Sequence, residues 1–255
     1  MNWRGSILVG RLLLFAAIIL GTEFGVRSGV MSPIFFSSPS QILAVLVDQL
    51  RDGTLLYDIW VTLFETLSGL ALGALLGMTV GLVLPQLRAF SQVIEPFLMT
   101  LNGIPVIVIA PLFVLWLGIG IFSKLGISIY IVFFALFIPV YTGSIRLERE
   151  LVDALYVMGA TRAQIFWKVV LPSSLPSVYT GLKIGAGLSL IGAVIGEFVA
   201  SRSGLGHMIL YASGTLDTPT LYLGIIVLAI FAAGLSGAIN ALGRIMVRWR
   251  FADEK

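Results

Sequence analysis

Long apolar stretches separated by short polar connections dominate this chain of 255 residues. A helix needs roughly 20 apolar residues to cross a bilayer. Stretches that approach or exceed this length lie at 59–84, 93–117, 126–141, 178–200 and 221–247, and a weaker one, interrupted by Arg11, lies at 7–25. The pattern predicts an all-α, polytopic membrane protein with about six transmembrane helices, forming one domain over residues 1–255 with its core at about 58–247.

The N-terminal stretch has two interpretations. Arg4 followed by an apolar run is typical of a cleaved signal peptide. The residues after the run, Gly21-Thr22-Glu23, form a poor cleavage site, so we favour a retained first span.

Composition agrees with a lipid-facing exterior, because only 11% of the residues are charged and 58% are hydrophobic, whereas soluble domains carry about 25% charged residues. Mean hydropathy is +1.03. The net charge of +3 does not indicate a nucleic-acid partner, since the basic residues form no stripe interleaved with aromatics.

The distribution of Lys and Arg predicts the orientation, because cytoplasmic connections are richer in both. With the N-terminus in the cytoplasm, the inner side holds Arg4, Arg11, Arg88, Arg146, Arg149, Arg162, Lys168, Arg244, Arg248, Arg250 and Lys255, and the outer side holds Arg27, Arg51, Lys124 and Arg202. We therefore expect a multi-pass protein of the inner (plasma) membrane with both termini in the cytoplasm.

Two long connections carry helical patterns. The outer one, at 30–58, predicts a short interfacial helix that starts after the turn at 37–40 and ends at Gly53. The inner one, at about 142–177, predicts an amphipathic helix over 148–158, a break at Gly159, and a second helix that Thr161 and Gln164 open with a capping box and Pro172 ends. From the pattern alone, this helix pair either docks a soluble partner or lies on the membrane surface.

Residues 150–172 resemble the EAA–x3–G–x9–I–x–LP signature of permease subunits of binding-protein-dependent ABC importers. The spacing is kept, and Asp153, Leu155 and Val169 depart from the signature while keeping charge sign or apolar character. The segments 102–124 and 181–206 are similar to the nitrate/sulfonate/taurine branch, in which position 65 is more often basic than the Glu65 found here. The resemblance covers residues 33–247.

The resemblance implies a type I importer permease in which the inner loop is a coupling helix held by an ATPase. It implies a homodimer of the permease, two cytoplasmic ATP-binding subunits that bind ATP and Mg, a periplasmic or extracellular solute-binding protein, and no cofactor in this chain. The expected function is inward movement of a small anionic or polar solute, such as a sulfonate, nitrate or taurine, by alternating access. The residues expected to couple to the ATPase are Glu150, Asp153, Ala154, Leu155, Met158, Gly159, Ala160, Leu171 and Pro172.

A stripe of small residues marks the first strongly predicted span. Glycines recur there at every fourth residue, at Gly69, Gly73, Gly77 and Gly81, and shorter versions occur at 181/185 and 192/196. Small residues at this spacing allow close approach of a neighbouring helix. Whether that neighbour belongs to the same chain or to a second copy is left open by the pattern.

Four residues are candidates for the substrate path. Asn102 and Pro105 interrupt the stretch at 93–117, where a bend either lines a pathway or is a structural kink. Glu65 and Glu197 are ionisable groups in apolar surroundings, which points either to work on a substrate or to pairing with Lys124 or Arg202.

Other classes of protein lack support. The chain has no cysteine and one histidine, His207, in a Gly-rich segment, so we expect no metal site and interpret His207 as a loop residue. No Gly-rich loop with a phosphate-binding Lys is present, so we expect no ATP hydrolysis by this chain. A secondary transporter would show internal repeats and intramembrane charges, and a membrane-embedded enzyme would need acid/base groups in a cleft.

Overall fold

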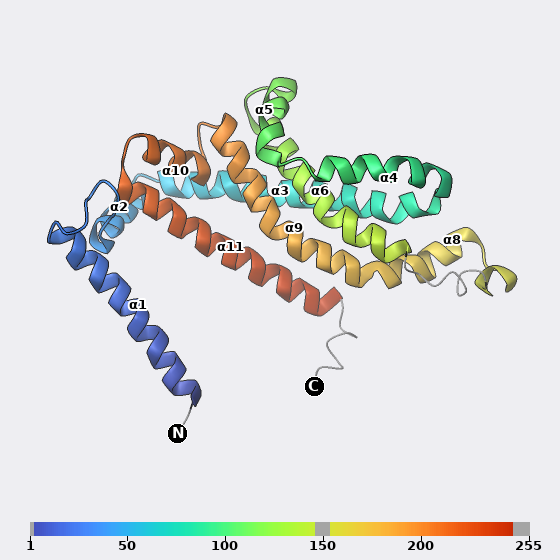
Figure 1. The fold of residues 1–255 in the computed structure, drawn as a ribbon, viewed down its shortest axis with the longest axis horizontal. Coiled ribbons are helices and arrows are strands. Elements are labelled where there is room, and N and C mark those ends of the chain that lie inside the picture. Colours follow the sequence, from blue (N-terminus) through green and yellow to red (C-terminus); the bar gives the residue numbers. More distant parts are fainter. Residues whose placement is uncertain (1–2, 146–153, 247–255) are drawn as a thin grey trace. The chain divides into compact units, whose positions relative to one another are not determined.

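The computed structural model describes residues 3–145 and 154–246, and every regular element in these residues is helical. The all-α prediction is confirmed. In chain order the α-helices are α1 (Trp3–Arg27), α2 (Pro39–Arg51), α3 (Thr54–Val83), α4 (Arg88–Asn102), α5 (Val106–Leu117), α6 (Ile121–Ile145), α8 (Arg162–Ile165), α9 (Leu171–Ala200), α10 (Leu205–Gly214) and α11 (Thr218–Met246) (Figure 1).

Among the described residues, five helices are long and apolar enough to cross a membrane, and α4 with α5 makes a sixth candidate if the pair counts as one span. The bend predicted in the stretch at 93–117 is present and is sharp, because α4 and α5 meet at an angle of 102°. The chain leaves the helix at Gly103, and Pro105 precedes the first residue of α5. Proline supplies no backbone donor and disfavours helical backbone in the residue before it, so the break falls here.

A second correction concerns Pro172, which does not end the inner helix. A helical segment runs without interruption from Arg162 to Ala200, through both Pro172 and Pro176. Just before Pro172 lies a π-helical turn, Phe166–Val170, in which the Leu171 amide donates to the Phe166 carbonyl. This wider turn shifts the hydrogen-bond register ahead of the proline, and Pro172 itself stands in the first turn of α9, where a missing donor is tolerated.

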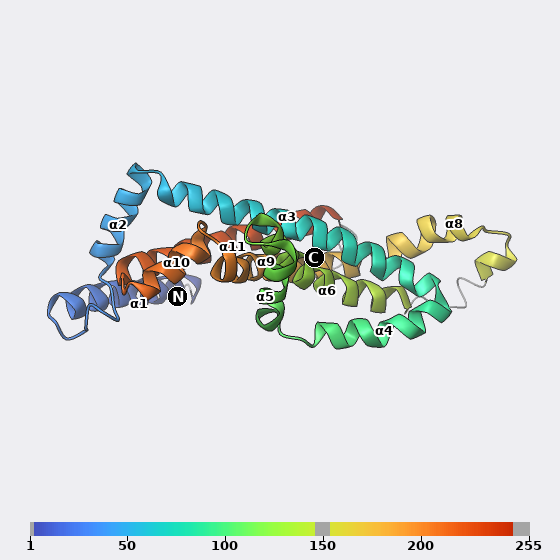
Figure 2. The same ribbon diagram turned by 90° about the horizontal axis from the view of Figure 1, so that it is seen from above.

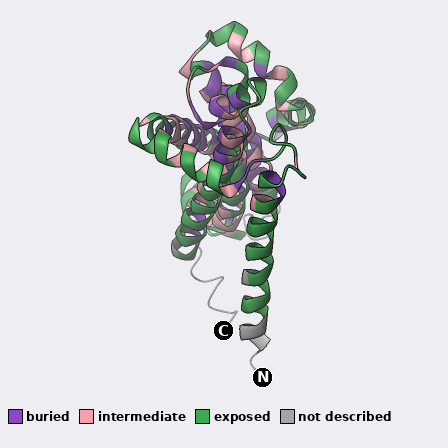
Figure 3. Ribbon diagram, turned by 90° about the vertical axis from the view of Figure 1, so that its left-hand side faces the viewer, coloured by how far each residue is buried: buried purple, intermediate pink, exposed green. Residues whose placement is uncertain are grey.

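The chain divides into two compact units, Met1–Val61 with Ser203–Ala229, and Thr62–Arg202 with Ile230–Lys255. In the first unit, α2 begins at a capping box between Ser38 and Gln41 and ends before Gly53, which has φ of +81°. The predicted short helix between 37 and 53 is therefore confirmed. The buried residues Leu55, Leu205, Met208 and Leu223 form the core of this unit. Exposed residues follow α1 over most of its described part, and Gly25 and Val26 near its end are buried (Figure 3).

In the second unit, α6 lies between α3 and α9 (Figures 1 and 2). The glycine stripe of α3 faces α6 of the same chain: a methyl group added at the four positions would meet Ser128, Val132, Phe133 and Val140, respectively. The glycines at 181, 185, 192 and 196 of α9 also face α6, chiefly at Leu136, Ser128 and Lys124. Two small-residue faces therefore let α3 and α9 approach α6 closely.

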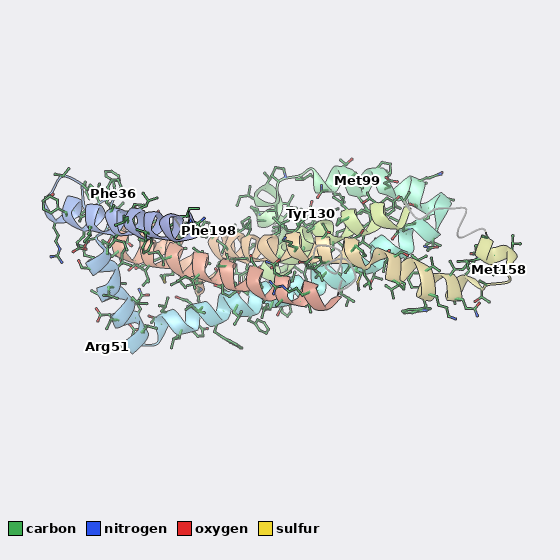
Figure 4. The ribbon with its side chains drawn as sticks, turned by 90° about the horizontal axis from the view of Figure 1, so that it is seen from below. Phe36, Arg51, Met99, Tyr130, Met158 and Phe198 are labelled. Carbon is green, nitrogen blue, oxygen red and sulfur yellow. The ribbon has the colours of Figure 1, made fainter. Side chains whose placement is uncertain are left out.

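A row of aromatic side chains on α6 forms the core towards α4. Phe134, Phe137 and Tyr141 are buried, with Leu98 and Met99 of α4 packed against them. Figure 4 labels Met99 and Tyr130 on these two helices. Each unit thus has its own buried core, and α6 is the central helix of the second one.

Candidate functional site

The predicted coupling loop is described from Ala154 onward, and Glu150 and Asp153 lie outside the described residues. A helical turn ends at Gly159, whose φ is +84°. The Gly159 amide donates to the Tyr156 carbonyl at 3.0 Å, and the Ala160 amide donates to the Leu155 carbonyl at 3.0 Å. This pair of bonds is the Schellman motif, which uses glycine because other residues are strained at positive φ.

The next helix begins one residue after this stop. Thr161 caps α8: its hydroxyl accepts from the Gln164 amide at 3.3 Å, and the Gln164 side chain accepts from the Thr161 amide at 2.8 Å. The predicted capping box is therefore confirmed. A helix stop and a helix start follow each other directly, so the direction of the chain is fixed locally by these four hydrogen bonds.

The loop element, residues 154–170, is anchored on one side and open on the other. Ile165 and Val170 are buried with Leu82, Val140 and Val178, and Leu155 and Ala160 pack against this cluster. By contrast, Val157 and Met158 are 90% and 81% exposed, and Figure 4 shows Met158 at the tip of the element. The open side carries a shallow hollow of about 350 Å³, lined by Leu155, Met158, Gly159, Ala160, Gln164, Ile165, Lys168 and Val169. The element thus presents exposed apolar side chains at Val157 and Met158 beside a hollow whose lining is both polar and apolar, and its other side is attached to the helix core.

We expect Thr161→Ala to weaken the start of α8 by about 1 kcal/mol, because it removes the acceptor for the Gln164 amide. Hydrogen exchange at that amide should accelerate about fivefold, which corresponds to the same free energy. Thr180→Ala in α9 is the control, since the Thr180 hydroxyl bonds only to the Pro176 carbonyl of its own helix. Equal exchange rates in the Thr161→Ala variant and the unmodified protein would contradict the cap.

A second candidate site is a cluster of buried charges, formed by Glu65, Lys124 and Glu197 together with Thr62 and Ser201. Glu65 forms an ion pair with the Lys124 ammonium. Lys124 Nζ also donates to Ser201 Oγ at 3.0 Å, and Thr62 Oγ1 donates to Glu197 Oε1 at 2.6 Å. These contacts join α3, α6 and α9.

The sequence left Lys124 and Arg202 open as partners of Glu65. In the structure Glu65 pairs with Lys124, whereas Arg202 is exposed.

The structure brings together two of the four path candidates and separates the others from them. Glu65 and Glu197 share the charge cluster, whereas Asn102 and Pro105 flank the break between α4 and α5 and are exposed. At this break the Tyr130 hydroxyl donates to the Leu101 carbonyl at 2.5 Å, which connects the end of α4 to α6.

A further polar cluster was not predicted. Tyr141 of α6 donates to Glu95 at 2.6 Å and lies 2.7 Å from the Ser91 hydroxyl, both on α4. The sequence signal for it was weak: Ser91 and Glu95 are four residues apart and therefore on one face of α4. No group of three or more His, Cys, Asp or Glu side chains within the described ranges is placed to hold a metal ion.

Membrane-length helices and a bent helix pair are the architecture of a polytopic membrane protein. The chain belongs to the family of binding-protein-dependent transport system inner membrane components, whose pattern it matches over residues 69–251. It is therefore a multi-pass inner-membrane protein and the permease subunit of an ABC importer.

Several curated relatives match over most of their length. The chain is 32% identical to the formylaminopyrimidine transport permease protein ThiX of Halalkalibacterium halodurans, over 93% of this chain and 94% of that protein. It is 34% identical to the riboflavin transport system permease protein RibX of Chloroflexus aurantiacus, over 89% and 85%. It is 31% identical to the taurine transport system permease protein TauC of Escherichia coli, over 86% and 82%.

Solved structures agree on the fold. An inward-facing structure of the MetNI methionine ABC transporter superposes with a TM-score of 0.68 at 20% identity, covering 78% of this chain and 99% of the matched chain. A second inward-facing form of that transporter gives a TM-score of 0.64 at 21% identity, covering 76% and 96%. The predicted resemblance to type I importer permeases is confirmed.

Proposed function

We propose that this chain forms the transmembrane path of an ATP-driven importer and moves a small polar solute inward by alternating access. In the proposed assembly, two copies of the chain act with two cytoplasmic ATP-binding subunits, which bind ATP and Mg, and with a solute-binding protein outside. Membership of the permease family supports the proposal that the chain forms the transmembrane path. The exposed side of the loop element is the observation that supports a contact with the ATP-binding subunit. If the partner subunit binds the ATP, as proposed, the permease needs such a contact to respond to ATP hydrolysis.

The loop element suits this contact for a physical reason. An exposed apolar surface on a soluble-facing segment favours a protein partner, because burying it removes apolar area from water. On its opposite side, Leu155 and Ala160 pack against the cluster that contains Val178 of α9, so a force on the turn between them would reach α9 through packed side chains. We therefore propose that the coupling residues include Ala154, Leu155, Met158, Gly159, Ala160, Leu171 and Pro172, together with Glu150 and Asp153.

The path is proposed to run beside the break between α4 and α5. In lipid, non-helical backbone is tolerated only where protein covers it or where it lines a water-filled cavity. Asn102 and Pro105 lie at such a break and are exposed in the single chain. Glu65 and Glu197 are 1% and 0% exposed and are held by neighbouring side chains, so the contacts favour a role in holding helices over contact with solute.

The substrate class is proposed from the relatives, whose names refer to formylaminopyrimidine, riboflavin, taurine and aliphatic sulfonates. These compounds share polarity and small size, and they include anionic sulfonates. A thermal-shift screen of the partner binding protein against such compounds would identify the solute. Stabilisation by none of them would argue against this class.

Because the chain has no cysteine, single-cysteine variants test the topology and the partner directly. Met158→Cys and Val30→Cys are well matched, since the two side chains are 81% and 82% exposed. We expect a membrane-impermeant maleimide to label Val30→Cys in intact spheroplasts and Met158→Cys only in inverted vesicles. We also expect Met158→Cys, but not Val30→Cys, to cross-link to the ATP-binding subunit. Labelling of Met158→Cys from outside would overturn the proposal.

A further inference from the structure

Helix α2 carries more apolar side chains than its contacts within the first unit use. Its packed side consists of residues that lie against the core of that unit, namely Ile42, Val45 and Leu46. A second apolar row follows one side of the helix at spacings of four and three residues. The members of this open row are Leu43, Val47 and Leu50, which are 59%, 38% and 43% exposed. The helix therefore has a packed side, an open apolar side and, at Gln41, Ala44 and Asp48, an exposed side that is largely polar.

Both ends of α2 are attached to the ends of membrane-length helices. At the start, the Ser40 amide donates to Glu23 Oε2 at 3.0 Å and the Ser40 hydroxyl donates to Glu23 Oε1 at 2.8 Å, near the end of α1. At the other end, Asp52 Oδ1 accepts from the Thr54 amide at 2.9 Å and from the Thr54 hydroxyl at 2.7 Å, at the start of α3. The chain turns sharply between α2 and α3 (Figure 2). Because α1 and α3 are both long and apolar enough to cross a membrane, a helix that joins their ends lies along the membrane surface.

Aromatic side chains at the start of α3 mark the level of the lipid headgroups. Tyr57 and Trp60, in the first two turns of α3, are each 60% exposed, and tyrosine and tryptophan gather at the boundary between lipid and water. Only Asp52 and Gly53 separate α2 from α3, so the last turn of α2 lies at this level. Arg51, which is exposed at the corner between the two helices (Figure 4), supplies a cation for lipid phosphate there.

We propose that the open row of α2 inserts into the lipid interface beside the start of α3, so that α2 anchors the first unit to the membrane surface. A lipid surface fits better than a soluble protein, because α2 is fixed between two membrane-length helices at the level of the headgroups. The packed side then faces the protein, the open row faces the acyl chains and the polar side faces water. The anchor keeps the ends of α1 and α3 at one depth, and it depends neither on the solute nor on ATP-driven import.

Spin labels on single-cysteine variants of the full chain in lipid nanodiscs test the proposal, since the chain has no cysteine of its own. Leu43→Cys and Val47→Cys place the label on the open row. Ala44→Cys and Asp48→Cys, each one residue further along, place it on the polar side as matched controls, and all four positions are exposed. We compare collisions with oxygen, which concentrates in lipid, with collisions with a water-soluble nickel chelate. The ratio of oxygen to nickel collisions should be about threefold higher, or more, at 43 and 47 than at 44 and 48.

Three other results would overturn the lipid anchor. Equal ratios at all four positions would place the open row in water. Labels at 43 and 47 that meet the nickel chelate until purified solute-binding protein is added would show that the row docks this protein. Labels at 43 and 47 that neither reagent reaches would show that protein, such as a second copy of the chain, covers the row.

Discussion

Replacing Gly159 with proline is expected to abolish ATP-driven uptake while leaving the chain in the membrane. Proline cannot adopt the φ of +84° found at this position, and it lacks the amide that donates to the Tyr156 carbonyl. The turn between the two helices of the loop element would then take another path and displace Met158. Uptake into proteoliposomes, measured with the ATP-binding subunits and binding protein present, should fall at least 100-fold.

Gly159→Asn is the matched control for this prediction. Asparagine keeps the amide and adopts left-handed backbone more readily than most residues, and an added side chain meets open space at position 159. We expect this variant to retain most of the uptake. If the proline variant transports at the unmodified rate, the loop element does not couple the chain to ATP hydrolysis.

The second large effect is expected for Gly77→Ala in the middle of α3. The added methyl would lie 2.5 Å from the Phe133 carbonyl oxygen and 3.0 Å from Leu136 Cβ, so the backbone of α6 would have to move away. Overpacking of this kind costs about 1–3 kcal/mol or more. The unfolding midpoint of the detergent-solubilised chain should fall by about 2–12 °C.

Gly187→Ala supplies the comparison, because position 187 is also within a long helix but has nothing within 4 Å of an added methyl. Alanine is the better helix former by about 1 kcal/mol, so this variant should be as stable as the unmodified chain or slightly more stable. Equal midpoints for both variants would mean that α3 does not approach α6 as closely as described.

Features governed by local rules could be predicted from the sequence. The positions of the long helices follow from the length of the apolar runs, and the capped turn at Gly159 and Thr161 follows from backbone chemistry within about ten residues. The glycine spacing in α3 indicates that something approaches closely. The spacing does not tell which helix lies against the stripe. That depends on contacts between distant residues, such as Gly77 of α3 with the backbone of Phe133 of α6, 56 positions away in the sequence.

Features that depend on neighbouring turns or distant side chains could not be predicted. A proline normally ends a helix, yet Pro172 does not, because a π turn precedes it. The residues of the stretch at 93–117 predicted a bend at Asn102 and Pro105, but the angle of 102° between α4 and α5 could not be predicted. The pairing of Glu65 with Lys124 and the bonds of Tyr141 to α4 join residues far apart in the chain.

The unbroken helical segment from Arg162 to Ala200 has a mechanical consequence. Its 39 residues have a contour length of about 58 Å at 1.5 Å per residue, nearly twice the thickness of the hydrocarbon core of a bilayer. The capped turn stands at one end of this rod, and Glu197 stands near the other. A displacement at the capped turn would therefore move the far end of the same helical segment, and the π turn at Phe166–Val170 is where we expect the segment to bend.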